Sequence, residues 1–308
     1  MNRGFEDEEA QHAGNGVQFA PMSEKRLIDE PRKLAAETAL GKRLGVDELF
    51  CLKLWRAAFG ELIGTAALVF MLDTIVISIV QTEAEHATLL MSILIAVAVA
   101  LLVLCTMPIS GGHLSPVVSL SAALIGLISL TRAVVYTAVQ CLGATLGALA
   151  VKAVISSATE DLFSLCGCTV TVLVPTPAGN IAVGLETGRA LWLEIICTFL
   201  FLVASIWTAF DLRRDKRLSP LILCSIIGLV VGLLLFVSTT LTGKRGYSGV
   251  GMNPARCIGP ALVRGGHLWS GHWVFWVGPG IAITAFYLYM KIIPKEHFHA
   301  AEYKYAIL

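Results

Sequence analysis

Two segments of the chain, Ser110-Gly-Gly-His-Leu-Ser-Pro-Val-Val-Ser119 and Ser248-Gly-Val-Gly-Met-Asn-Pro-Ala-Arg-Cys257, follow one pattern. Each reads Ser-Gly, three residues, a small polar residue and then Pro. Proline suits the first turn of a helix, because the N–H that it lacks would have no helical partner there. We therefore expect each segment to be a loop that leads into a short helix.

The rest of the sequence indicates a membrane protein. Of its 308 residues, 56% are hydrophobic and 15% are charged, and the net charge is +1. Soluble domains carry more charge than this, and a near-neutral chain gives no reason to expect nucleic-acid binding. We expect residues 1–50, which are polar and have no secretory signal pattern, and residues 294–308 to be tails around a membrane domain at 51–293.

Six apolar segments are long enough to cross the roughly 30 Å of bilayer hydrocarbon at about 1.5 Å per helical residue. Two shorter segments begin with Pro and cannot cross, so we predict re-entrant half-helices there. The long segments are Leu54–Val80, Ala87–Met107, Ala133–Ile155, Ala190–Phe210, Leu218–Leu241 and Trp273–Met290, and the short ones are Pro116–Leu130 and Pro254–Val263.

Lys and Arg residues predict the orientation. Cytosolic loops are enriched in these residues, which places both termini and the fourth connection in the cytosol. Lys244 and Arg245 oppose the trend. The residues that support the orientation are Arg32, Lys33, Lys42, Arg43, Arg213, Arg214, Lys216, Arg217, Lys291 and Lys295.

The two halves of the sequence repeat. Glu61-Leu-Ile-Gly-Thr65 matches Glu194-Ile-Ile-Cys-Thr198, 194 − 61 = 133 residues later, and Ser115 precedes Asn253 by a similar 253 − 115 = 138. Three spans per repeat invert the second copy, and such folds place the working site where broken helices meet near the midplane. We predict an all-α membrane protein with six transmembrane helices, two half-helices and inverted repeats at about 54–155 and 190–290.

Ser115 and Asn253 occupy the expected N-cap positions of the half-helices. Two helix N-termini at mid-membrane concentrate positive potential, which repels protons and cations while neutral molecules pass. The Asn253 amide and the Ser115 hydroxyl can donate hydrogen bonds to a passing oxygen.

From about Ala57 to Ile293 the sequence resembles the major intrinsic proteins, the family of aquaporins and aquaglyceroporins. Met252-Asn-Pro-Ala-Arg256, followed by Ile258-Gly-Pro-Ala-Leu262, resembles the family's second Asn-Pro-Ala motif. Ser115, Pro116 and Val117 stand for the first, with Ser for Asn and Val for Ala, whereas Asn253, Pro254 and Ala255 form the second. Cys257 and the altered first motif resemble the X intrinsic protein subfamily of plants and fungi.

The resemblance implies a homotetramer with one pore per subunit, each pore having a four-residue selectivity filter. Arg256, Val250 and Ile95 match three filter positions, and the fifth-helix position is Thr239 or, alternatively, Val231. The filter then lacks the His and the aromatic residue that resemble a water-selective pore.

An aliphatic filter beside one arginine predicts a passive channel for small uncharged solutes: glycerol, urea, boric acid and hydrogen peroxide. Water gains few hydrogen bonds there, so we expect low or modest water permeability. The resemblance also implies a plasma-membrane location. The alternatives are a water-selective aquaporin and an inverted-repeat secondary transporter driven through Glu61 and Glu194. We find no pattern typical of an enzyme, a cofactor site or a metal site.

Glu61 and Glu194 are expected to accept hydrogen bonds from the re-entrant loops, as in the family, and not to relay protons. For His113 we favour a loop-bracing hydrogen bond over a pH-sensing role.

The eight cysteines do not suggest a disulfide framework. Cys166 and Cys168 are too close in sequence for an easy mutual disulfide, which leaves an intersubunit disulfide or thiol modification open. Cys257 either packs or reacts, since it lies at a half-helix start beside an arginine.

Overall fold

The computed structural model describes residues 41, 43–176, 179–210 and 219–292. Residues 1–40 and 294–308 of the expected tails lie outside the described residues, as do the basic residues at 213–217. Within the expected N-terminal tail, η1 (Val46–Phe50) is a 3-10 helix, and Glu48 in it pairs with Arg132 at 2.8 Å. A short described element therefore precedes the first long helix.

Six long apolar helices confirm the predicted spans. They are long and apolar enough to cross a membrane in the part of the chain that the structure describes. Most of their ends lie within about three residues of the predicted ones, which is the usual uncertainty of boundaries. The helices are α2 (Leu52–Gln81), α3 (Ala87–Ser110), α5 (Leu130–Val154), α7 (Thr187–Phe210), α8 (Pro220–Thr242) and α10 (Val274–Ile292).

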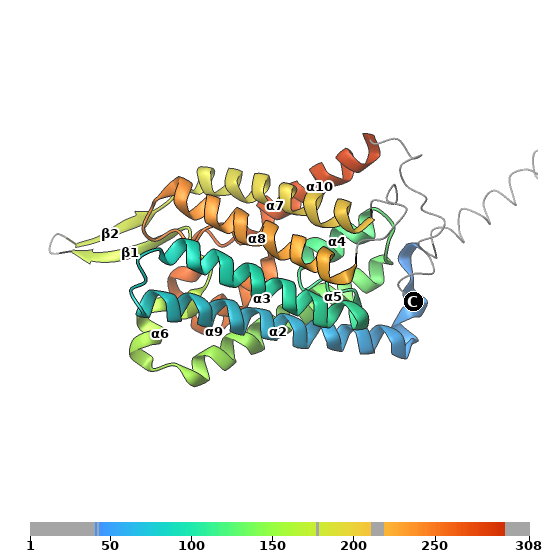
Figure 1. Ribbon diagram of the computed structural model, residues 1–308, viewed down its shortest axis with the longest axis horizontal. Helices are drawn as coiled ribbons and strands as arrows, with labels where there is room; N and C mark the ends of the chain where they lie inside the picture. Colours follow the sequence, from blue (N-terminus) through green and yellow to red (C-terminus); the bar gives the residue numbers. More distant parts are fainter. Residues whose placement is uncertain (1–40, 42, 177–178, 211–218, 293–308) are drawn as a thin grey trace, which may run out of the picture. The chain divides into compact units, whose positions relative to one another are not determined.

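The two short helices, α4 (Pro116–Leu124) and α9 (Pro254–Arg264), both begin with Pro. They lie toward opposite ends of the helix bundle (Figure 1). The first is shorter than the predicted 116–130, because Gly126 takes a positive φ of 86° just beyond it and the N–H of Leu127 turns back to the carbonyl of Ala122. A left-handed residue with such a returning hydrogen bond is a common way to end a helix.

The helices pack as an inverted repeat. In the first half α2 packs on α5, in the second half α7 packs on α10, and α3 packs on α8 between the halves. Glycines allow the backbones to approach: a Cβ on Gly143 of α5 would collide with the Leu62 carbonyl of α2, and one on Gly228 of α8 with the Ala96 carbonyl of α3. Small residues at such crossings are typical of membrane helices.

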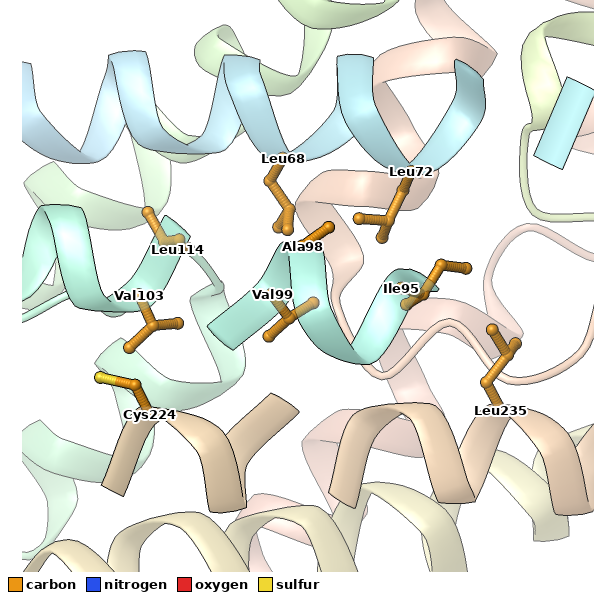
Figure 2. Packing of buried hydrophobic residues seen from close by; sticks show 9 residues of the cluster. All are labelled: Leu68, Leu72, Ile95, Ala98, Val99, Val103, Leu114, Cys224 and Leu235. Carbon is orange, nitrogen blue, oxygen red and sulfur yellow. The ribbon is translucent and has the colours of Figure 1, made fainter. Parts of the chain in front are cut away.

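An aliphatic cluster joins α2, α3 and α8 to the first re-entrant loop. Figure 2 shows Leu68 and Leu72 of α2 above residues of α3, with Cys224 and Leu235 of α8 below them. Leu114, the residue before the Ser115 cap of α4, belongs to the same cluster. The core of the bundle is therefore continuous with one of the two loops that the sequence singles out.

The connection between α5 and α7 contains regular structure. Ser156 caps α6 (Ser157–Phe163) by accepting a hydrogen bond from the Thr159 N–H at 3.1 Å. After η2 (Ser164–Cys166) come β1 (Thr171–Thr176) and β2 (Gly179–Gly184), an antiparallel pair with Thr171 opposite Gly184. A further 3-10 helix, η3 (Gly266–Trp269), precedes α10. These short elements could not be predicted from the sequence, because the segment is rich in turn-forming residues.

Candidate functional site

The two re-entrant loops meet inside the bundle. Asn253 caps α9, where its Oδ1 accepts hydrogen bonds from the N–H groups of Ala255 at 3.1 Å and Arg256 at 3.4 Å. The Nδ2 of Asn253 donates to the carbonyl of Leu114 at 2.8 Å, across to the other loop. Ser115 caps α4 through the N–H of Val117 at 3.3 Å. Both half-helices therefore start from the same small region.

A cavity of about 160 Å³ lies at this meeting point. Its polar side chains are those of His113, Ser115, Ser205, Asn253 and Arg256, and most of the remaining wall is aliphatic. Val117 and Ala255, by contrast, are fully buried behind the helix starts. The cavity thus offers a few hydrogen-bonding groups on an apolar wall, which is the usual character of a small-molecule site.

Glu61, fully buried on α2, holds the first loop. Its carboxylate accepts the N–H of His113 at 3.0 Å, the N–H of Leu114 at 2.7 Å and the Nε2 of Gln140 at 2.8 Å. The hydroxyl of Ser110 also donates to it. These bonds satisfy loop donors that would otherwise be unpaired at membrane depth.

His113 is braced by its neighbours. Its Nδ1 lies 3.1 Å from the Oγ of Ser119. Its ring packs edge to face with the ring of Tyr136, and the two ring centroids are 5.4 Å apart. The Tyr136 hydroxyl donates in turn to the Ser110 carbonyl at 3.0 Å. The histidine therefore lies inside a hydrogen-bonded network of the first repeat.

Glu194 on α7 holds the second loop in the corresponding way. It is fully buried and accepts the N–H groups of Gly251 and Met252, the latter at 3.2 Å. Met252 and Leu114 stand directly before the two caps, and both take left-handed backbone, with φ of 51° and 49°. Such values are uncommon for bulky residues. Sequence reading missed this feature because nothing in the letters Leu and Met indicates it.

Of the residues expected in a selectivity filter, Arg256 and the alternative Val231 line the cavity, whereas Ile95, Thr239 and Val250 are not part of its lining. Ile95 and Val250 are each 2% exposed, and Arg256 is half-buried at the start of α9. Thr239 donates its hydroxyl to the carbonyl of Leu235 at 2.8 Å, within α8. Leu235 shares a buried cluster with Ile95, and Figure 2 shows its side chain directed toward Ile95. Val231, the alternative, lines the cavity.

A disulfide joins Cys168 to Cys257, 89 residues apart, with their Cα atoms 5.0 Å from each other. The expectation that the cysteines form no disulfide framework was wrong for this pair. Cys257 is not the packed or reactive thiol that we expected, and Cys168 is paired within the chain and not between subunits. The fold brings the segment after η2 against the start of α9, which no sequence spacing indicates. Cys166 is free and half-buried, and its Sγ donates to the carbonyl of Asp73 at 3.5 Å. Burial, and secondarily Asp73, raise the pKa of the Cys166 thiol.

Asp73 of α2 is a buried carboxyl group that the motifs did not predict. It is fully buried, and neither carboxylate oxygen has a hydrogen-bond partner among the described residues. No group of three or more His, Cys, Asp or Glu in the described part of the chain is arranged to hold a metal ion. The cavity at the loops has a few hydrogen-bonding groups on its wall, among them Asn253 and Arg256, which could bind a small molecule.

Six crossing helices and two half-helices that meet end to end around a cavity define an inverted-repeat membrane channel. The chain belongs to the major intrinsic protein family, whose model matches residues 48–289.

Known proteins agree with this assignment. Aquaporin PIP1-2 of Musa acuminata subsp. malaccensis is 33% identical over 80% of this chain and 81% of its own length. Aquaporin PIP 1-3 of Oryza sativa subsp. japonica is 34% identical over 79% of this chain and 80% of its own length. The X-ray structure of the aquaglyceroporin from Plasmodium falciparum has a TM-score of 0.62, 20% identity, and covers 78% of this chain and 96% of its own. At that identity the last comparison supports the fold alone.

Proposed function

We propose that this channel conducts small uncharged solutes passively, with glycerol, urea, boric acid and hydrogen peroxide as candidates. Water permeability is low or modest, and protons and ions are excluded. The observation that carries the proposal is the mostly aliphatic wall of the cavity that the half-buried Arg256 lines together with Ser115 and Asn253. Ile95 and Val250, the other proposed filter residues, are aliphatic as well. A solute with both apolar and polar atoms can contact the aliphatic wall and still direct oxygens to the guanidinium.

For the fifth-helix position we propose Thr239 or Val231 and add Leu235 as a third candidate, since Val231 and Leu235 both pack in the cluster of Ile95 and Val231 also lines the cavity. Leu235 packs with Ile95, whereas the Thr239 hydroxyl is engaged with the carbonyls of its own helix. If Leu235 and not Thr239 occupies the fifth-helix position, the filter is more apolar, which strengthens the argument against fast water passage. A Leu235→His variant is expected to raise the ratio of water to glycerol permeability, and Thr239→Ala to change it much less.

Exclusion of ions and protons follows from the helix starts. The N-termini of α4 and α9 meet at Ser115 and Asn253, and the Arg256 charge adds to their positive potential. Glu61 and Glu194 support the loops in this proposal. Their carboxylate oxygens are occupied by loop donors, which argues against the transporter alternative, where they would relay protons.

The alternative of a water-selective channel is favoured by one observation, the similarity to relatives named aquaporins. Stopped-flow light scattering on proteoliposomes separates the two, with water, glycerol and boric acid measured in parallel. Fast glycerol or boric acid entry with weak water flux supports the proposal. Fast water flux without solute entry would refute it.

We further propose a homotetramer in the plasma membrane, with both termini in the cytosol, and membership of the X intrinsic protein subfamily. The Lys and Arg distribution supports the orientation, and Cys257 with the Ser-Pro-Val motif at Ser115 supports the subfamily. Cross-linking in native membranes and protease protection of a tagged terminus test the assembly and the orientation.

A further inference from the structure

The sulfur pair Cys168–Cys257 lies directly against the arginine of the pathway. The Nη1 of Arg256 donates to the Sγ of Cys168 at 3.3 Å, and Cys257 is the next residue along the chain. The Nε of Arg256 is buried and has no hydrogen-bond partner among the described residues. Arg256 is therefore linked to the disulfide twice: through the backbone, by the next residue Cys257, and through the hydrogen bond to Cys168.

We propose that the Cys168–Cys257 disulfide is a positioning element for Arg256, and that it sets which solutes the channel passes. The inference rests on the proposed function only in treating Arg256 as part of the solute path. The disulfide fixes the guanidinium in two ways. The sulfur of Cys168 accepts a hydrogen bond from Arg256, and the sulfur of Cys257 ties the residue after Arg256 to Cys168.

Burial indicates a permanent clamp and not a switch. Cys168 and Cys257 are each 1% exposed, and they share a buried cluster with Tyr247 and Phe275. A thiol reductant needs access to a sulfur in order to attack it. Gly251 lies against the same pair, since a Cβ there would meet the sulfurs of Cys257 and Cys168. The disulfide thus fills the space between the second re-entrant loop and the connection between α5 and α7.

The surrounding hydrogen bonds allow the clamp to be removed without unfolding the loop. The N–H of Thr169 donates to the Oγ of Ser248 at 3.0 Å, and the N–H of Ser248 to the carbonyl of Thr169 at 3.1 Å. The hydroxyl of Thr169 donates to the carbonyl of Gly246 at 2.9 Å. These three bonds hold the connection to the second loop independently. Loss of the disulfide should therefore free Arg256 while the loops stay in place.

The test is a cycle of variants in proteoliposomes. The Cys168→Ala/Cys257→Ala variant is expected to change the ratio of glycerol to water permeability at least about threefold, a coupling typical of residues in contact. In an Arg256→Val background the same pair of changes should have no further effect, because its target is gone. Cys166→Ser, two residues away, serves as the matched control and should leave the ratio unchanged.

An equal effect of the cysteine changes in both backgrounds would overturn the proposal, and so would an unchanged ratio. A peptide map without reductant that lacks the Cys168–Cys257 linkage would also overturn it. If the double variant does not fold, wild-type vesicles are reduced until mapping shows the pair open, and the ratio is measured again. An open pair with an unchanged ratio refutes the positioning role.

The proposed function is judged separately, on wild-type flux alone. If the wild type conducts only water, the proposal that the channel conducts small solutes is refuted. The positioning role is then judged on water permeability in the same four variants of the cycle. Non-additive effects of the disulfide and Arg256 on water flux would still support it, and additive effects would still overturn it.

Discussion

Removal of the Glu61 carboxylate tests whether buried glutamates hold the re-entrant loops. In Glu61→Ala the N–H groups of His113 and Leu114 lose their acceptor. An orphaned buried donor costs about 1–3 kcal/mol, so the two together predict a loss of roughly 2–6 kcal/mol. The other two donors have alternatives, which keeps them out of this sum.

Those alternatives are visible in the hydrogen-bond network. The Ser110 hydroxyl lies 3.3 Å from the carbonyl of Thr106, and Gln140 keeps its bond to the Oγ of Ser119 at 3.0 Å. The same reasoning applied to Glu194→Ala again gives two orphaned N–H groups, those of Gly251 and Met252. We therefore expect the two variants to lose similar stability, although Glu61 accepts twice as many hydrogen bonds.

The assay is thermal unfolding of purified protein in detergent, followed by tryptophan fluorescence, with glycerol and water flux measured in vesicles. At about 2–4 °C per kcal/mol, each variant should melt at least about 4 °C lower. Glu85→Ala removes an exposed carboxylate and is the control, with an expected shift near zero. If Glu61→Ala melts together with this control, or far below Glu194→Ala, the accounting of orphaned donors is wrong.

Three further predictions address the packing, the buried charge and the free thiol. Gly228→Val should lower the melting temperature by more than about 4 °C, because the new Cβ collides with the Ala96 carbonyl; near-normal melting would show that α3 and α8 can separate. Asp73→Asn should leave the melting temperature unchanged or raise it, because an amide loses less on burial than a carboxylate without hydrogen-bond partners; a fall of several degrees would indicate a partner for the charge. Maleimide labelling followed by peptide mapping should find Cys166 slower than the exposed Cys51 at pH 7, and faster as pH rises toward its raised pKa, since the thiolate is the reactive form; equal rates at pH 7 would refute this.

The long helices could be predicted because a bilayer imposes one simple requirement on the sequence. Every crossing segment must satisfy its own backbone groups, so an apolar run of sufficient length is a helix whatever its neighbours are. The half-helices were equally accessible, since Pro116 and Pro254 follow polar caps. The short elements α6 and the β1–β2 pair were not predicted, because they depend on local capping and strand pairing among turn-forming residues.

The site divides in the same way between short-range and long-range features. The cap positions Ser115 and Asn253 depend on residues within three positions, which a motif records. The pairing of Cys168 with Cys257 and the approach of Leu235 to Ile95 depend on segments brought together by the fold. No spacing along one sequence carries that information.

The inverted repeat links these two kinds of feature. Each half carries a glutamate on its first long helix, and that glutamate binds the N–H of a left-handed residue directly before the cap, Leu114 or Met252. The halves differ in what is added: the second has Arg256 and the disulfide, and the first has His113 and its network. A symmetric scaffold therefore holds an asymmetric pathway. Val250, Arg256 and the fifth-helix residue of the proposed filter lie in the second half and Ile95 lies in the first, so selectivity is expected to depend mainly on the second half. Substitutions of the two glutamates are expected to affect their own loops to a similar extent.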